Sequence, residues 1–510
     1  MSNNKQIAKN IFFNSLSFGI NLLITFFLTP YLIKTVGKEA YSFFPLVNNM
    51  IGYTEILTAT IGSMAGRFIT MAYYQGNQEE TKGFFNSAIV AYLGFSAFFC
   101  IIGFFVIIFI NNILNIPDGL TEQVQFLFGL ALLGTCINLC TYLFGIGTYV
   151  KNRLDIRSIA NLTRHIIYVI IIFLLFALFK PTIVFVSIAS FISVLVSVTF
   201  NLHFWKRFLP EISFQPKKYF SWKKIATLLN SGIWMSINSL SNILTTTIDL
   251  LLTNIFISAT VTGDFSISKM VPTFIASLAG LVGGTFTANF NILYAKEKYT
   301  ELLHEIKKSM VIISFLLSVP IGYFMVNSDY FFQLWVSSAY TSDMFWLSFI
   351  ALFLSATGYS TNTLYGVYTI TDKRKIPTFA LLASGLLNIL LVFILLKFTS
   401  LGVYAIALSS AISLGLRNVV FTPIYGAKCL HLKWTIFYPH LVKGFIGIAI
   451  VVCITLFSRL FMTHLTWFSF IINIVVVCCL SLVANYYFFL KKEERAYLIN
   501  LVQKRLNNFH

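Results

Sequence analysis

The stretch IANLTRHIIYVIIIFLLFALFKPTIVFVSIASFISVLVSVTFNLHF, residues 159–204, decides the fold of this chain. Two apolar runs, 159–179 and 182–204, are separated only by Lys180 and Pro181. Each run has about 20 residues, which is the length that an α-helix needs to cross the hydrocarbon core of a bilayer. The stretch therefore predicts two consecutive transmembrane helices.

The same pattern recurs along all 510 residues, of which 57% are hydrophobic and 11% are charged. Soluble domains contain about 25% charged residues, so the composition indicates an all-α integral membrane protein. We predict about fourteen transmembrane helices. They cover residues 10–33, 41–72, 84–110, 124–149, 159–179, 182–204, 226–256, 264–294, 309–327, 344–369, 377–396, 401–427, 438–458 and 466–490. The first run lacks a small-residue cleavage site, so we expect it to stay in the membrane as an anchor.

Loops rich in Lys and Arg alternate along the chain with loops that contain few of them. This alternation predicts which loops face the cytoplasm. With the N-terminus inside, 27 of the 36 lie in or beside cytoplasmic segments, five lie outside and four lie within spans. Both termini are therefore predicted to be cytoplasmic. The net charge of +18 reflects this topology and attraction to anionic membrane lipids, and it does not indicate a nucleic-acid partner.

A short repeat predicts the domain organisation. Asn14-Ser15-Leu16-Ser17 in the first span recurs as Asn238-Ser239-Leu240-Ser241 in the seventh. Six helices separate the copies, so both run in the same direction, and we predict two six-helix lobes with pseudo-twofold symmetry around a central cationic cavity. Two further C-terminal helices would follow the lobes. The predicted boundaries are 1–210 and 225–428 for the lobes, 211–224 for a basic cytoplasmic loop and 429–490 for the last two helices.

The C-terminal tail, residues 491–510, alternates apolar and basic residues at helical spacing. This pattern favours an amphipathic helix on the inner membrane surface, with a solvated tail as the alternative.

Polar residues share single faces of several predicted spans. Asn14, Asn21 and Thr25 lie on one face of the first span, and Asn238 and Asn242 lie on one face of the seventh. Small and hydroxyl residues are common where membrane helices pack, but packing explains a run of Asn poorly. We therefore expect these faces to line a water-filled cavity, with Asn21, Asn238 and Asn242 as candidate substrate-binding residues.

Charged residues within spans are costly unless they face a cavity or a partner. Arg67, Arg164, Lys269 and Arg417 outnumber the acids Glu55 and Asp249, which predicts a cationic cavity suited to an anionic headgroup. Arg binds phosphate through two parallel hydrogen bonds. Two simpler interpretations remain: Arg67 and Arg164 reach the cytoplasmic surface, and Asp249 pairs with Lys269.

Cofactors have little support in the sequence. The seven Cys show neither a disulfide framework nor a zinc-site spacing, and there is no GxxxxGK[ST] motif for a nucleotide. An ion gradient is therefore the expected energy source, with Glu55 or Asp249 as the coupling and gating residue, and with H+ or Na+ as the ion.

At one place the sequence resembles a known family. Residues 29–33, Thr-Pro-Tyr-Leu-Ile, and residues 36–41, Val-Gly-Lys-Glu-Ala-Tyr, resemble a signature of the polysaccharide flippases. These are the Wzx-type members of the multidrug/oligosaccharidyl-lipid/polysaccharide (MOP) exporter superfamily. The stretch 62–68 is similar to the end of that family's second helix, while Ser42 departs from its usual glycine.

The resemblance implies a function. Such proteins move undecaprenyl-diphosphate-linked oligosaccharide units across the bacterial cytoplasmic membrane during the synthesis of O-antigen, capsule or exopolysaccharide. In that case Arg67 and Arg164 would attract the diphosphate at the cytoplasmic mouth, and Arg417 and Lys269 would hold it further along. A polysaccharide polymerase and a chain-length regulator are further candidate partners.

Three other functions remain as alternatives. A drug/cation antiporter of the same superfamily would need acidic cation sites, and the first span has no carboxylate. A flippase for lipid II, the peptidoglycan precursor, differs only in substrate. A glycan polymerase would need reactive groups in a large external loop, and the longest one, 328–343, contains Asp329 and Asp343 but no His, Lys or Arg.

Overall fold

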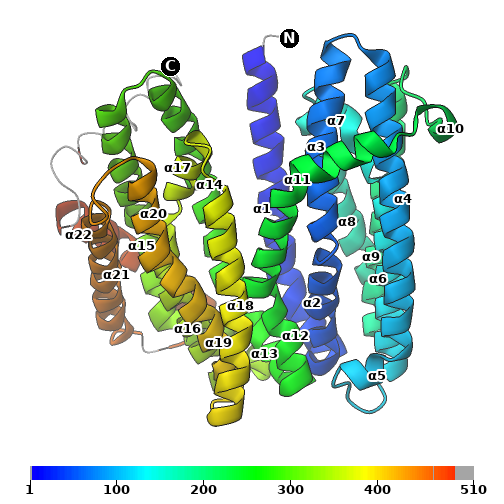
Figure 1. Ribbon diagram of the computed structural model, residues 1–510. Coiled ribbons are helices and arrows are strands. Elements are labelled where there is room, and N and C mark those ends of the chain that lie inside the picture. The colour runs from blue at the N-terminus through cyan, green and yellow to red at the C-terminus, as the bar shows by residue number, and fades with distance from the viewer. Residues whose placement is uncertain (1–2, 463, 489–494, 496–510) are drawn as a thin grey trace. The chain divides into compact units, whose positions relative to one another are not determined.

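The computed structural model describes residues 3–462, 464–488 and 495. Its secondary structure is helical throughout these residues, with no β-strand (Figure 1). The predicted amphipathic tail, 491–510, lies outside the described residues apart from Arg495. Two compact units are formed, one by residues 1–243 and 250–263 and the other by residues 244–249 and 264–510.

The first unit begins with three helices that precede the turn at residues 75–77. They are α1 (Asn3–Val36), α2 (Lys38–Gly52) and α3 (Glu55–Tyr74). The elements that follow are α4 (Gln78–Ile108), α5 (Ile110–Ile113), α6 (Thr121–Thr141), the 3-10 helix η1 (Tyr142–Gly145), α7 (Ile146–Val150), α8 (Leu154–Leu178), α9 (Ile183–Phe208), α10 (Pro216–Tyr219) and α11 (Trp222–Asn242).

Three elements contain the boundaries between the units: the π-helix η2 (Ile243–Thr247), α12 (Ile248–Phe256) and α13 (Ala259–Ser268). The second unit continues with α14 (Met270–Ala295), α15 (Tyr299–Trp335), η3 (Ser337–Ala339), α16 (Ser342–Thr361), α17 (Leu364–Ile370), α18 (Lys375–Phe398), α19 (Val403–Leu416), the π-helix η4 (Arg417–Phe421), α20 (Thr422–Cys429), α21 (Tyr438–Arg459) and α22 (Trp467–Phe488). The predicted lobe boundaries at 210 and 225 stay predictions, while α11 groups with the first unit.

Twelve helical segments among the described residues are long and apolar enough to cross a membrane. The all-helical membrane fold is thus confirmed, and the difference from the predicted fourteen lies in two spans. Residues 41–72 form two helices, α2 and α3, because the α-helical hydrogen-bond pattern is interrupted at Tyr53 and Thr54. There each backbone N–H donates to the carbonyl oxygen three residues back, not four. Residues 226–256 are divided among α11, η2 and α12.

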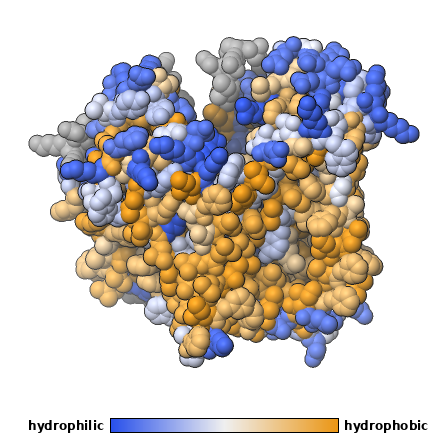
Figure 2. All heavy atoms as spheres, in the orientation of Figure 1, coloured by the Kyte–Doolittle hydropathy of each residue, from blue (hydrophilic) through white to orange (hydrophobic). Residues whose placement is uncertain are grey.

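Hydrophobic side chains cover the middle of the helices on the face shown in Figure 2, and hydrophilic residues gather at the helix ends. The α4 residues Phe98, Phe104 and Phe105 are each more than half exposed. Such a surface is stable only against lipid, which agrees with a multi-pass membrane protein.

Aromatic and aliphatic side chains fill the core of the first unit. Phe85 and Tyr92 of α4 are almost completely buried with Ile61 of α3 and Leu143 of η1. The Phe85 ring stacks on Trp205 of α9, with 6.0 Å between the ring centroids. This core fixes α3, α4 and α9 and so provides a rigid wall for the cavity described below.

The last two helices attach to the second unit through polar side chains. Tyr323 of α15 donates a hydrogen bond to Asn473 of α22 at 3.1 Å, and Asn485 of α22 donates to Ser318 of α15 at 2.9 Å. All four side chains are buried. In a membrane the hydrophobic effect does not drive helices together, so such hydrogen bonds help to specify which helices associate.

Candidate functional site

The small-residue face of α3 creates space inside the first unit. Ala59 and Ser63 are four residues apart, and so are Gly62 and Gly66, which start three residues later, so all four lie on one side of the helix. A Cβ atom at Gly62 would lie 3.0 Å from the Tyr142 ring. Only glycine at this position therefore allows the ring to lie so close to the helix backbone.

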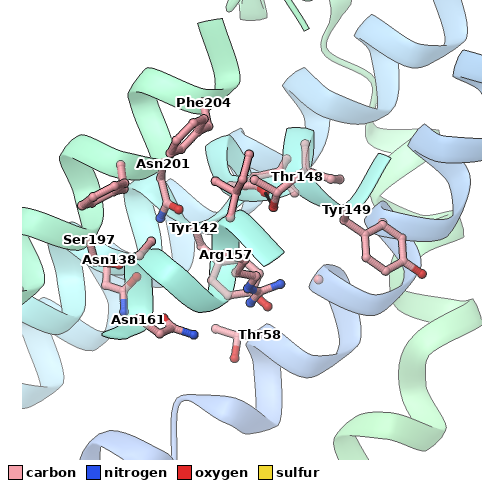
Figure 3. Close-up of a pocket in the computed structure, with 18 of the residues that line it drawn as sticks. Thr58, Asn138, Tyr142, Thr148, Tyr149, Arg157, Asn161, Ser197, Asn201 and Phe204 are labelled. Carbon is pink, nitrogen blue, oxygen red and sulfur yellow. Dashed lines mark hydrogen bonds between the residues drawn. The ribbon is translucent and has the colours of Figure 1, made fainter. Parts of the chain in front are cut away.

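A cavity of about 530 Å³ lies beside this face, entirely within the first unit. Ligand sites of small molecules commonly have volumes of about 300–1,000 Å³. Figure 3 shows side chains from α3, η1, α7, α8 and α9 around it. Its polar lining consists of Thr58, Ser63, Asn138, Tyr142, Thr148, Tyr149, Arg157, Asn161, Arg164, Ser197 and Asn201.

One face of α8 gives the cavity its charge. Arg157, Asn161 and Arg164 are four and three residues apart and all line it. The two arginines are the charged residues among the described lining, and no carboxylate is present there. The cavity is therefore cationic and suited to an anion.

Three amide side chains complete the polar wall. Asn138 of α6 and Asn201 of α9 line the cavity, and Asn201 lies against Gly145, where a Cβ atom would be 2.8 Å from the Asn201 Oδ1 atom. In the described part of the chain, the side chains of Asn138, Asn161 and Asn201 make no hydrogen bond. The guanidinium groups of Arg157 and Arg164 likewise have no hydrogen bond or ion pair with any described residue. All five groups are available to bind a ligand.

A buried carboxylate fixes the helix that presents Arg157. Asp155, at the start of α8, accepts hydrogen bonds from Gln6 at 2.9 Å and from the Arg153 Nε atom at 3.0 Å, and its Oδ2 atom lies 3.3 Å from the Lys9 Nζ atom. Asn10 accepts a hydrogen bond from the Asp155 backbone N–H at 2.9 Å. The N-terminal turns of α1 are thereby held against the start of α8.

Sequence reasoning missed this cluster. The signal available was an acidic residue in the first turn of a helix, where the helix dipole favours a negative charge. The cavity asparagines were missed for another reason: Asn138 and Asn201 are each the single Asn of a predicted span, 124–149 and 182–204. The Ser residues at helical spacing before Asn201, such as Ser193 and Ser197, are of a kind common where membrane helices pack.

The structure brings only one of the predicted binding residues, Arg164, into the lining of this cavity. Arg67 is exposed in α3 one residue after Gly66, outside the lining. Glu55 is the exposed first residue of α3. Asn21 is half-buried in α1.

Two other predicted asparagines, Asn238 and Asn242, lie on α11. Both are exposed, and Asn242 donates a hydrogen bond to the Asn238 side chain at 2.8 Å. The pair confirms that they share a face of the helix.

Asp249 and Lys269 form an ion pair within the second unit, with 2.7 Å between the Lys269 Nζ and Asp249 Oδ2 atoms. Lys269 also donates to the Thr246 carbonyl oxygen of η2 at 2.7 Å, and Asn388 of α18 donates to the Asp249 Oδ1 atom at 3.3 Å. The Asp249 side chain is 1% exposed and that of Lys269 is 25% exposed. The pairing that the sequence left as an alternative is therefore present.

Arg417 begins the π-helix η4, and neighbouring side chains hold it on two sides. It donates to the Tyr365 hydroxyl at 2.7 Å and to the Asn418 side chain at 2.9 Å, and its guanidinium carbon lies 5.6 Å from the centre of the Tyr365 ring. A Cβ atom at Gly358 would lie 2.7 Å from the Asn418 amide nitrogen, so glycine leaves room for Asn418. The guanidinium group thus has a fixed direction.

Known proteins provide independent information. The model of the polysaccharide biosynthesis protein family matches residues 7–287, more than half of the chain. The protein described as "Uncharacterized membrane protein EpsK" of Bacillus subtilis (strain 168) is 28% identical over 437 residues, which cover 85% of each chain.

Solved structures share the fold. An inward-facing multidrug resistance MATE family transporter of the MOP superfamily superposes with a TM-score of 0.64 at 13% identity, over 80% of this chain and 94% of that one. The lipid II flippase MurJ, in its inward closed conformation, gives a TM-score of 0.62 at 15% identity, over 95% of this chain and 99% of that one. These comparisons confirm the family found in the sequence: the chain is a multi-pass membrane protein that belongs to the polysaccharide biosynthesis protein family, and it shares its fold with these solved structures.

Proposed function

We propose that this protein carries undecaprenyl-diphosphate-linked oligosaccharide units from the inner to the outer face of the bacterial cytoplasmic membrane. The observation that carries the proposal is the cavity of the first unit, where Arg157 and Arg164 face the space with no carboxylate in the described lining. Membership of the polysaccharide biosynthesis family supports a glycan as the cargo.

The physical argument begins with charge. Arg164 lies within the predicted span 159–179 and has no ion-pair partner among the described residues, and a charge there is costly unless water or an anion satisfies it. A diphosphate offers several acceptor oxygens, and the planar guanidinium group binds such oxygens through two parallel hydrogen bonds. The lipid tail can stay in the bilayer while the cavity binds the headgroup.

We propose alternating access as the transport mechanism, with each step assigned to predicted residues. Arg67 and Arg164 attract the diphosphate, and Arg417 and Lys269 bind it later. Glu55 or Asp249 resets the site by binding H+ or Na+. Neutralising Asp249 would release Lys269 from its ion pair and free that ammonium group for the diphosphate.

The same proposal covers the cellular context. The protein acts as a secondary transporter with no catalytic residues, in the cytoplasmic membrane, with both termini in the cytoplasm. A polysaccharide polymerase and a chain-length regulator are the proposed partners at the outer face.

A strain that lacks the gene but still synthesises the glycan provides the test. We expect a complete lipid-linked repeat unit to accumulate on the cytoplasmic face, detected by mass spectrometry of extracted lipids, and surface glycan to disappear. Unchanged lipid-linked intermediates together with new drug sensitivity would instead identify a drug/cation antiporter. Accumulation of lipid II would identify the peptidoglycan precursor as the cargo.

A further inference from the structure

The cavity of the first unit contains hydrogen-bond acceptors that a diphosphate cannot use. Each asparagine side chain has one carbonyl acceptor and an NH₂ group with two donors. A fully ionised diphosphate accepts hydrogen bonds and donates none. The carbonyl oxygens of Asn138, Asn161 and Asn201 are therefore usable only by a ligand that also donates hydrogen bonds.

We propose that this cavity is a saccharide subsite. In it Asn138, Asn161 and Asn201 bind the hydroxyl or amide groups of the sugar attached to the diphosphate, while Arg157 and Arg164 bind the phosphate. The inference rests on the proposed function and adds the residues that select the sugar.

The order of residues on α8 supports this assignment. Asn161 lies between Arg157 and Arg164 on one helix face, and all three line the cavity. Arg157 and Arg164 are seven residues apart, which is about 10 Å along a helix. A ligand held by both guanidinium groups therefore passes the Asn161 amide.

Aromatic rings provide the second kind of contact that a sugar requires. Tyr142, Tyr149 and Phe204 line the same cavity, and the two tyrosines are 38% and 51% exposed. A pyranose ring has an apolar face of C–H groups and an edge of hydroxyl groups. A lining that contains both aromatic rings and amides matches both parts of a sugar, whereas a bare phosphate would use only the arginines.

The α3 helix keeps the space open at the other wall. Ala59, Gly62 and Ser63 present no side chain larger than a hydroxymethyl group to the cavity. Together with the volume of about 530 Å³, this leaves room for a group larger than a phosphate.

Binding to the full-length protein in lipid nanodiscs tests the inference. There are three soluble probes. One is methyl diphosphate, and the other two are the sugar diphosphates formed when glucose or N-acetylglucosamine is attached to methyl diphosphate. The variants are Asn138→Leu, Asn161→Leu, Asn201→Leu and Arg164→Gln. Asn112→Leu serves as the matched control, because Asn112 is exposed in α5 and lies outside the cavity.

We expect the wild-type protein to bind at least one sugar diphosphate about tenfold or more tightly than methyl diphosphate. Each cavity Asn→Leu variant should lose about tenfold in affinity for that sugar diphosphate and keep its affinity for methyl diphosphate. Arg164→Gln should weaken both probes, and Asn112→Leu neither.

Two results would overturn the inference. One is equal affinity of the wild-type protein for all three probes, which would leave a simple anion site. The other is an equal loss for both kinds of probe in the Asn variants, which would indicate a structural role. Asn161 is exposed at the cavity, so its variant keeps the test valid if a substitution in α6 or α9 prevents folding.

The gene-deletion experiment separates this inference from the proposed function. Selective binding of a sugar diphosphate without accumulation of lipid-linked oligosaccharide would remove the transport role and keep the subsite. Accumulation of lipid-linked oligosaccharide without selective binding of a sugar diphosphate would keep the transport role and remove the subsite.

Discussion

Charged side chains of the first unit differ in how many hydrogen-bond and ion-pair partners they have. Asp155 is fully buried and is bound by Gln6, Lys9 and Arg153, whereas Arg157 and Arg164 have no such partner among the described residues. A charge at mid-bilayer costs about 2.5–3.5 kcal/mol on insertion scales. The first arrangement stabilises the fold, and the second leaves charge available for a ligand.

Asp155→Asn should lower the thermal stability of the protein. The substitution keeps the shape but removes the charge that Lys9 and Arg153 neutralise, which we expect to cost about 1–3 kcal/mol. Glu301→Gln is the control, because Glu301 and its partner Lys298 are both about half exposed and an exposed pair contributes at most about 1 kcal/mol. The midpoint temperature of thermal unfolding in detergent is measured for both variants. Equal decreases in this temperature would contradict a special role for Asp155.

Arg417→Ala should abolish glycan export while the protein still inserts into the membrane. The guanidinium group is fixed by Tyr365 and Asn418, so we expect it to bind the diphosphate in one geometry. Tyr365→Phe removes one of these hydrogen bonds and should reduce export less. Surface glycan and membrane-fraction protein are measured together, and full export by Arg417→Ala would remove this residue from the mechanism.

The α3 helix shows at the scale of an element how missing side chains create a site. Gly62→Val would place a Cβ atom 2.9 Å from the Tyr92 hydroxyl and 3.0 Å from the Tyr142 ring, with two further methyl groups to accommodate beside the cavity. We expect this variant to lose sugar-diphosphate binding and export while it still reaches the membrane. The control is Gly94→Val on α4, where an added Cβ atom meets nothing within 4 Å, so both variants have the same β-branched residue in a helix. Equal activity of the two variants would show that the cavity is not used.

Hydropathy predicted most of the helices because lipid imposes one length and one composition on every span. It could not predict the turn at Tyr53 and Thr54 or the π-helices η2 and η4, because neighbouring helices decide where a hydrogen-bond ladder breaks. The same limit applied to the site. Arg164 was predicted as a binding residue because a charge in an apolar run is conspicuous, but a single Asn such as Asn138 resembles an ordinary packing residue until the fold places it in the same cavity lining as Arg164.

At the scale of the whole molecule, the Lys and Arg distribution predicts that the segment 209–221 faces the cytoplasm and that the turn 336–341 faces outward. Gln215→Cys and Ser338→Cys place thiols at exposed positions in these two segments. A membrane-impermeant maleimide should label Ser338→Cys in intact cells, and Gln215→Cys only after permeabilisation. The parent chain gives the background from its native cysteines, and the opposite labelling would invert the topology.

The polar attachment of α22 to α15 has a consequence for the order in which the chain is made. The ribosome completes Ser318 and Tyr323 of α15 well before it reaches Asn473 and Asn485 of α22. During that interval these α15 groups have no partner from the last helix and must meet lipid, water or the insertion machinery. A nascent chain that stops before α22 therefore exposes these polar α15 side chains within the bilayer. For a quality-control protease that recognises exposed polar side chains in the membrane, they are a physical signal of an unfinished molecule.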